Sequence, residues 1–169
     1  MSSWPGKHNI ISKIKYKKRH YQIKNKKKFF ATFPYPYLNG PLHIGHAFTS
    51  TRVDVFSRYK RLKGYNVLFP FGFHATGEPI VGMAKRIKAC DEKQINVLKE
   101  SGVSNEDLKK FENPYHIVKF YKNLIKENAK SLGLSIDWTR SFTTIDDEYT
   151  RFISWQYNRL KDLNYVIIE

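Results

Sequence analysis

The chain has 169 residues, a formal net charge of +15 and 41% hydrophobic residues, which fits one ordinary globular domain. Its one cysteine, Cys90, excludes an internal disulfide and a four-thiolate zinc site within the chain. No apolar run reaches the roughly 18 residues that a transmembrane helix needs, so no membrane span is expected.

The N-terminal segment is strongly basic. The stretch "KHNIISKIKYKKRHYQIKNKKK", residues 7–28, carries ten Lys or Arg, and the first acidic residue of the chain is Asp54. We therefore expect a basic N-terminal extension over residues 1–27, followed by a folded part over residues 28–169. Such a block of positive charge is typical of proteins that contact a polyanion such as RNA. A solvated basic tail without a specific role is the alternative.

The first elements are predicted from residue 28 onwards. "KFFATF", 28–33, and "NVLFPF", 66–71, are apolar runs of strand length. A helix is predicted between them, from about Ile44 to Lys63, with Gly64 as its C-terminal cap. Its apolar stripe recurs at helical spacing and consists of Phe48, Val55, Phe56, Tyr59 and Leu62. A strand, a helix and a strand in this order predict a parallel βαβ unit. The expected fold class is α/β, the first half of a doubly wound, Rossmann-like nucleotide-binding domain.

The second half of the chain is predicted to be mainly helical. Residues 90–112 are polar and charged, which predicts an insertion or a mobile connection. A helix follows, with Asn113 as its N-cap, Pro114 at its first position and Gly133 at its end. Its expected buried face consists of Ile117, Val118, Tyr121, Leu124, Ile125 and Leu132. "DWTRSFTT", 137–144, predicts a loop with a short strand, and a last helix is expected from about residue 146 to residue 163.

The turn after the first strand carries the residues of chemical interest. Neither G-x-x-x-x-G-K-[ST] nor G-x-G-x-x-G occurs there, and the turn reads H-I-G-H instead. His43 and His46 share one face at a helix start, beside free N–H groups and the positive end of the helix dipole. Gly45 has no side chain, so a flat base or ribose can lie against the backbone. The pattern predicts a site that holds a nucleoside triphosphate and stabilises charge on its phosphate.

A metal site is the alternative interpretation of the same histidines. His74 would then be a third ligand, and Glu78 could complete the set. No cluster of acidic ligands accompanies these residues in the sequence. We therefore predict the phosphate site and no metal ligands.

Several motifs together resemble one enzyme family. "PYPYLNGPLHIGH" is similar to the HIGH signature of class I aminoacyl-tRNA synthetases. "TFPYPYLNGPLHIGH", "RYKRLKGYNVLFPFGFHATGEPI" and "LGLSIDWTRSFTT" together resemble leucyl-tRNA synthetases of the archaeal and eukaryotic cytosolic type, over roughly residues 28–165. A synthetase of the related valine, isoleucine or methionine group stays open as an alternative. An adenylyl-transfer enzyme of related fold that acts on a small molecule is another.

The resemblance implies a reaction. Such enzymes join leucine to ATP, with Mg²⁺, to give leucyl-adenylate and pyrophosphate, and then pass the leucyl group to tRNA(Leu). By the resemblance, His43 and His46 bind the ATP phosphates and stabilise the transition state. The same resemblance assigns further residues to the ATP site, namely Asn39, Gly40 and Gly45. It also assigns residues to the leucine site: Phe33 and Tyr35 to the side-chain pocket, and His74 to the neighbourhood of the amino group.

Some motifs and domains of the family do not occur in this sequence. The second signature, K-M-S-K-S, grips the pyrophosphate end of ATP in the family and does not occur here. The editing domain and the anticodon-binding helices would lie beyond residue 169. We therefore expect a cytoplasmic fragment or split half that is inactive alone and is completed by a second polypeptide. A paralogue or remnant that binds RNA without catalysis is the alternative.

Overall fold

The structure, a computed structural model, describes residues 26–167. The basic extension predicted over 1–27 therefore lies almost entirely outside the described residues. The helices and strands follow in the order β1 (Lys28–Phe30), α1 (Ile44–Leu62), β2 (Asn66–Leu68), β3 (Gly72–Phe73), α2 (Glu78–Lys88), α3 (Glu92–Glu100), the 3₁₀ helix η2 (Leu108–Glu112), α4 (Pro114–Ser131), the 3₁₀ helix η3 (Trp138–Arg140), β4 (Phe142–Thr143) and α5 (Asp147–Asp162). Within this part of the chain no helix is long and apolar enough to cross a membrane.

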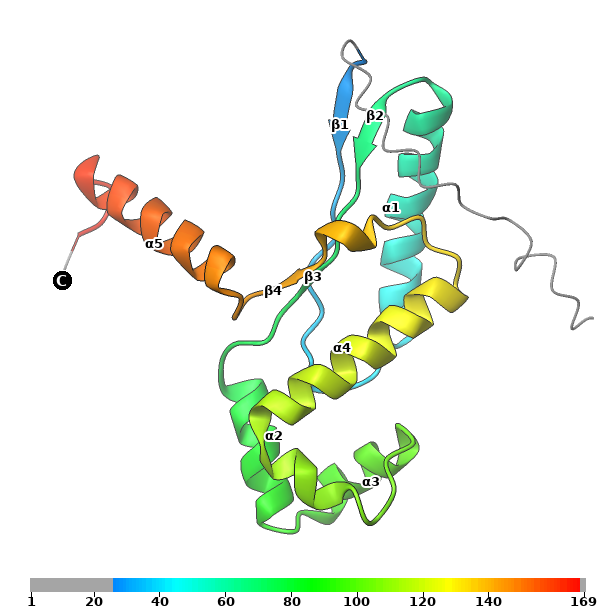
Figure 1. Ribbon diagram of the computed structural model, residues 1–169, viewed down its shortest axis with the longest axis vertical. Coiled ribbons are helices and arrows are strands. Elements are labelled where there is room, and N and C mark those ends of the chain that lie inside the picture. The colour runs from blue at the N-terminus through cyan, green and yellow to red at the C-terminus, as the bar shows by residue number, and fades with distance from the viewer. Residues whose placement is uncertain (1–25, 168–169) are drawn as a thin grey trace, which may run out of the picture.

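The strand–helix–strand unit at the start of the chain is confirmed. β1 pairs in parallel with β2, Lys28 opposite Asn66 and Phe30 opposite Leu68, and α1 connects them (Figure 1). The strands are shorter than the predicted 28–33 and 66–71. Pro70 lies within the second predicted strand and has no N–H to donate to its neighbour, so the parallel pairing cannot continue through it.

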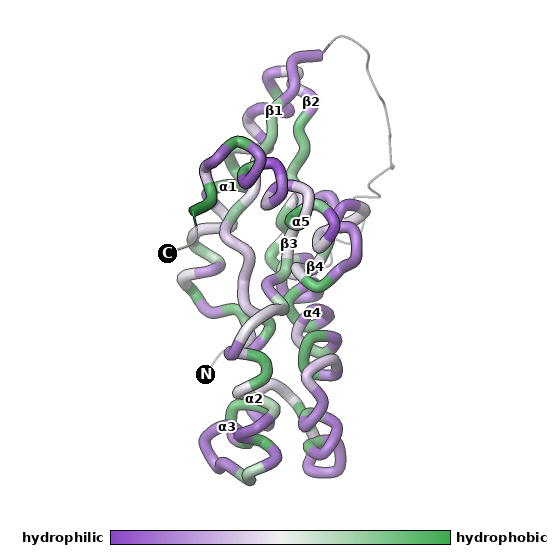
Figure 2. The backbone as a smooth tube through the Cα atoms, turned by 90° about the vertical axis from the view of Figure 1, so that its left-hand side faces the viewer, coloured by the Kyte–Doolittle hydropathy of each residue, from purple (hydrophilic) through white to green (hydrophobic). Residues whose placement is uncertain are grey.

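Three chain segments nevertheless run side by side beyond the short strands. The N–H of Leu38 donates to the carbonyl of His74 at 3.1 Å, so the loop after β1 follows the segment that contains β3. β3 pairs in parallel with β4, Gly72 opposite Phe142. The predicted short strand in 137–144 is confirmed as β4. The segment through β2 and β3 lies between its two neighbours and is hydrophobic, which places it at the centre of the fold (Figure 2).

Helix α1 has the predicted bounds, but the side that it buries is the polar one and not the apolar one. Gly64 follows it with φ +84°, as expected for a C-terminal cap. The residues that α1 buries are polar: Ser50, Asp54 and Ser57. The apolar stripe predicted for this helix lies instead on the exposed side, including Phe48, Val55, Phe56, Tyr59 and Leu62. Hydrogen bonds from the N–H and the hydroxyl of Ser135 to Asp54 explain why the polar side faces inward.

The segment 90–112 is folded, which corrects the expectation of a mobile connection. It forms α3 and η2, and it buries Leu98, Val103 and Phe111 in the core. Asp91 begins α3 as an N-cap, its carboxylate accepting from the N–H of Gln94 at 2.8 Å. The polar residues that dominate this stretch occupy the outer sides of short helices, and a few apolar anchors are enough to bury it.

The two last helices begin and end as predicted but differ in packing. Asn113 caps α4 by accepting from the N–H of Tyr115 at 2.9 Å. Most of the predicted face of α4 is buried, although Leu132 is exposed because it already belongs to the turn that ends the helix. Helix α5 buries no residue at all and projects away from the rest of the molecule (Figure 1).

Candidate active site at the start of α1

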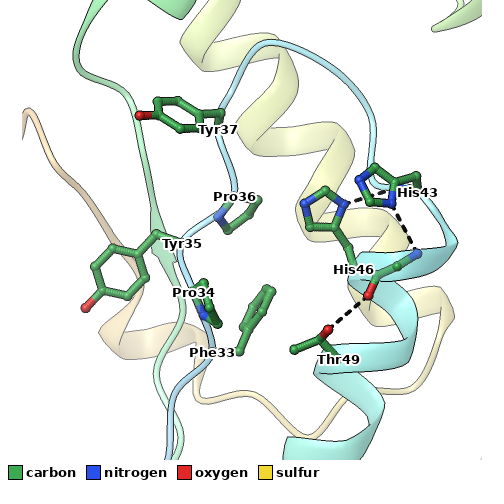
Figure 3. A pocket seen from close by; sticks show the side chains of 9 residues that line it. Phe33, Pro34, Tyr35, Pro36, Tyr37, His43, His46 and Thr49 are labelled. Carbon is green, nitrogen blue, oxygen red and sulfur yellow. Dashed lines mark hydrogen bonds between the residues drawn. The ribbon is translucent and has the colours of Figure 1, made fainter.

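The two histidines cap the helix on which they stand. The Nδ1 atom of His43, the N-cap residue, accepts from the N–H of Gly45 at 3.1 Å. The Nδ1 atom of His46 accepts from the N–H of His43 at 3.3 Å (Figure 3). Two imidazoles thus form the reciprocal capping box that Ser or Thr and Glu usually form. The motif therefore has a structural role in addition to any chemistry.

These hydrogen bonds assign the positions of the protons on both rings. A neutral imidazole whose Nδ1 accepts a hydrogen bond carries its proton on Nε2. The rings of His43 and His46 lie with their centroids 3.9 Å apart. Burial, and to a smaller extent the charge of His43, lowers the pKa of His46 below its ordinary value. In this tautomer the pair presents two Nε2–H donors side by side.

Gly45 lies close to the ring of His43, and a larger residue there would have to displace that ring. A Cβ atom on Gly45 would lie 3.0 Å from Cε1 and 3.1 Å from Nδ1 of His43, closer than side chains normally approach. The first turn of α1 carries no acidic side chain either. The positive end of the helix dipole is therefore not neutralised by the chain itself, which favours an anion at this position.

A pocket of about 290 Å³ opens beside the histidines. Its walls come from the loop after β1 and from the first turns of α1 (Figure 3), and its lining is Phe33, Pro34, Tyr35, Pro36, Tyr37, His43, Gly45, His46 and Thr49. Five of these residues were predicted as site residues, and the structure brings them together. The sequence analysis missed Pro34, Pro36, Tyr37 and Thr49. The signal for Pro34, Pro36 and Tyr37 was the run of alternating proline and aromatic residues, of which only Phe33 and Tyr35 were selected. Thr49 lies one helical turn after Gly45 and carried no signal of its own.

The aromatic side chains of the pocket pack against further aromatic residues on the side away from the pocket. Phe33 is buried and packs on Phe71, with ring centroids 4.9 Å apart. Tyr35 lies edge-on to Phe142 at 5.2 Å and covers Gly72. A Cβ atom at Gly72 would come within 2.6 Å of the Tyr35 ring, so only glycine allows this placement. Sequence reasoning missed Gly72, although a glycine inside a strand often marks such a close approach.

Three predicted site residues do not line the pocket. Asn39 and Gly40 belong to the bend between the aromatic loop and α1. His74 stands next to Tyr37, with ring centroids 4.0 Å apart and the planes at 89°. The Nδ1 atom of His74 is buried and has no hydrogen-bond partner in the part of the chain that the structure describes. His74 is thus one residue removed from the pocket wall and retains a polar atom for a ligand or a water molecule.

The metal alternative gains no support. Among residues 26–167, no three or more His, Cys, Asp or Glu side chains gather in a way that could hold a metal ion. The lining of the pocket contains no carboxylate.

Fold and site together define a class of protein. The family model described as tRNA synthetases class I (I, L, M and V) matches residues 9–167, and the chain belongs to this family. Its relatives include the leucine–tRNA ligase of Archaeoglobus fulgidus, which is 53% identical over 143 residues, 84% of this chain and 15% of the relative. That of Nanoarchaeum equitans is 44% identical over 141 residues, 83% of this chain and 14% of the relative.

A solved structure supports the fold. It is the ternary complex of an Agrobacterium radiobacter K84 LeuRS with tRNA and LeuAMS, and it matches with a TM-score of 0.59 at 22% identity. The match covers 82% of this chain and 15% of that one. The chain therefore spans only about 15% of the length of the relatives that it matches.

Proposed function

We propose that this chain is the first part of the catalytic domain of a leucine–tRNA ligase, the Rossmann-like half that carries the HIGH motif. The reaction joins leucine to ATP, releases pyrophosphate and transfers the leucyl group from leucyl-adenylate to tRNA(Leu). One observation carries the proposal: the paired histidines and the aromatic loop line one pocket in a chain that is 53% identical to a leucine–tRNA ligase.

The chemistry of activation suits a site without a nucleophile. An oxygen of the leucine carboxylate attacks the α-phosphorus of ATP, and pyrophosphate leaves from the opposite side. No bond to the protein forms, so positioning and electrostatic stabilisation supply the acceleration. The Nε2–H groups of His43 and His46 donate to the phosphate oxygens, on which negative charge grows. The uncompensated N-terminus of α1 adds to the same field.

The remaining residues have positioning roles in this proposal. Gly45 lies against the adenosine, and Asn39 and Gly40 border the ATP site. Phe33 and Tyr35 enclose the leucine side chain between rings that Phe71 and Phe142 hold in place. The family resemblance assigns His74 to the amino group of leucine. The buried Nδ1 atom of His74, which has no hydrogen-bond partner among the described residues, supports this role.

Mg²⁺ does not fit the described residues as a protein-bound ion. The pocket lining contains no carboxylate, and Mg²⁺ prefers carboxylate and phosphate oxygens. In this proposal Mg²⁺ therefore arrives on the phosphates of ATP, and no step is assigned to it.

The proposal includes partners and a location. The partners are tRNA(Leu) and the part of the enzyme that carries the K-M-S-K-S signature, either on the same polypeptide or on a second one. The basic extension over 1–27 contacts RNA in this proposal, since it carries nine Lys or Arg and no acidic residue. The site of action is the cytoplasm, where aminoacylation supplies protein synthesis.

The test is leucine-dependent ATP–pyrophosphate exchange with His46→Ala. The chain is combined with the part of the Archaeoglobus fulgidus relative that it does not span, called here the complement. Removing one preorganised donor typically costs about 2.7–4 kcal/mol, so exchange should fall about 100- to 1000-fold. Thr49→Ala is the matched control, because Thr49 lines the same pocket but its hydroxyl donates to the Gly45 carbonyl at 3.1 Å. Near-normal exchange by His46→Ala would remove the histidine from the mechanism.

A further inference from the structure

The ring of Tyr35 lies over a position of the sheet that has no side chain. β3 pairs in parallel with β4, and Gly72 of β3 stands opposite Phe142 of β4. The other neighbour of this segment is the aromatic loop, since the N–H of His74 donates to the carbonyl of Pro36 at 2.9 Å. Because Gly72 has no side chain, the rings of Tyr35 and Phe142 meet edge-on across it, with their centroids 5.2 Å apart.

Gly72 is needed for these rings and not for the backbone. It is not one of the glycines with positive φ, so its backbone conformation is open to alanine as well. A Cβ atom at this position would lie 2.6 Å from the Tyr35 ring and 2.9 Å from Cζ of Phe142. An added methyl group would therefore have to displace one of the two rings, and Tyr35 lines the pocket.

The ring contacts continue into the start of helix α5. Tyr149, in the first turn of the helix, is stacked on Phe142 with ring centroids 5.6 Å apart and the planes at 17°. Among the described residues, it is the one aromatic of α5 that packs on a ring outside the helix. Asp146, directly before the helix, accepts from the N–H of Thr143 at 2.8 Å and fixes the turn between β4 and α5. Phe142 thus contacts both the pocket wall at Tyr35 and the first turn of α5 (Figure 1).

We propose that Gly72, Phe142 and Tyr149 are positioning residues for the amino-acid substrate, because they hold the ring of Tyr35 in the orientation in which it contacts the leucine side chain. This inference rests on the proposed function. None of the three lines the pocket, so each acts through Tyr35. A wall that distinguishes one branched side chain from another needs a ring in a fixed place, and packed neighbours supply that. A purely structural role would lower the amount of active enzyme and leave the KM for leucine unchanged.

The test is leucine-dependent ATP–pyrophosphate exchange by the chain and its complement, with kcat and the KM for leucine measured separately. Tyr149→Ala should raise the KM for leucine about 3- to 10-fold, while kcat and the KM for ATP change less than about twofold. Gly72→Ala should raise the KM for leucine at least about 10-fold. Tyr149→Phe keeps the ring and should retain the normal KM. Tyr157→Ala is the matched control and should also be normal, since Tyr157 is a 51% exposed tyrosine of the same helix that packs on none of the described rings.

A second background shows whether the effect passes through Tyr35. In a chain that carries Tyr35→Ala, the further change Tyr149→Ala should alter the KM for leucine less than about twofold, because two residues that act through one contact are not additive. An equal effect of Tyr149→Ala with and without the Tyr35 ring would overturn the inference.

A readout on the chain alone separates this inference from the function on which it rests. The nuclear Overhauser contact between the Tyr35 ring and the Hα protons of Gly72 should weaken in Tyr149→Ala and persist in Tyr157→Ala. An unchanged contact in Tyr149→Ala, or a normal KM for leucine in that variant, would overturn the inference and uphold the ligase. Absence of leucine-dependent exchange by the unmodified chain with its complement would overturn the ligase proposal, and the Overhauser contact would still decide whether Tyr149 holds Tyr35 in place.

Discussion

At the residue scale, His43 combines two tasks that can be separated by substitution. Its Nδ1 atom caps α1 through the N–H of Gly45, and its Nε2–H is the group that we propose donates to the ATP phosphates. Asparagine is one of the best N-cap residues and has a short side chain that ends near the position of Nδ1. A change to asparagine therefore keeps the cap and removes the distal donor.

We predict that His43→Asn leaves stability almost unchanged while His43→Ala lowers it by about 1 kcal/mol. Both variants should lose at least about 100-fold in leucine-dependent exchange, because both lack the Nε2–H donor. Urea unfolding of the chain and exchange with the complement measure the two effects. Full exchange activity in His43→Asn would show that His43 is a cap and nothing more.

The protonation of His46 gives a second prediction at this scale. Burial first, and then the charge of His43, lowers the pKa of His46. In an NMR titration of the ring its midpoint should lie below the ordinary value of 6.5, and His43→Asn should move that midpoint upwards. A midpoint at or above 6.5 would contradict the assigned environment.

The same shift predicts how stability depends on pH. As pH falls below 6.5, His46 of the unfolded chain takes up a proton before His46 of the folded chain does. The unfolded state then binds more protons, so the contribution of His46 to stability is present above 6.5 and is lost as pH falls through the lower folded pKa. Urea unfolding between pH 7 and pH 5 measures this loss.

At the element scale, α1 is fixed to the body by a buried carboxylate. Asp54 is 5% exposed, and it accepts from the N–H of Ser135 at 2.6 Å and from Nε of Arg58 at 2.6 Å. The guanidinium of Arg61 donates to the hydroxyl and the carbonyl of Ser135. The motif "LGLSIDWTR" is therefore tied to the helix that carries the histidines.

Asp54→Ala should destabilise the chain by about 1–3 kcal/mol, because the Ser135 N–H loses its acceptor in a buried setting. Glu127→Ala is the control, since Glu127 forms an exposed ion pair with Lys130 at 2.7 Å, and such pairs contribute less than about 1 kcal/mol. Thermal or urea unfolding measures both. Equal effects of the two substitutions would contradict the role of Asp54.

The ends of the helices could be predicted from the sequence, whereas the side of helix α1 that packs against the core could not. Asn113, Pro114 and the glycines at 64 and 133 mark helix ends through local geometry, and the structure confirms them. The apolar stripe of α1 points outward because tertiary hydrogen bonds to Asp54 decide its orientation. A pattern of apolar residues marks one side of a helix but does not say what covers that side, and this chain spans about 15% of the length of its relatives.

At the scale of the whole molecule, the site could be predicted because its motifs follow one another directly along the chain. The proximity of Phe33, Tyr35 and the two histidines followed from their closeness in sequence, and the structure brings them into one pocket. The supports at Gly72 and Phe142 are distant in sequence and depend on the parallel pairing of β3 with β4. The roles of Asn39, Gly40 and His74 stay predictions.

The central claim is that the aromatic pocket selects leucine. The most direct measurement is ATP–pyrophosphate exchange by the chain with a complement that lacks its editing segment, using leucine, isoleucine, valine and methionine in turn. One methylene is worth about 1–3 kcal/mol in an apolar pocket. We expect a preference for leucine over isoleucine or valine of roughly 10- to 200-fold. Faster exchange with valine or methionine than with leucine would contradict the leucine assignment and leave membership of the class I family intact.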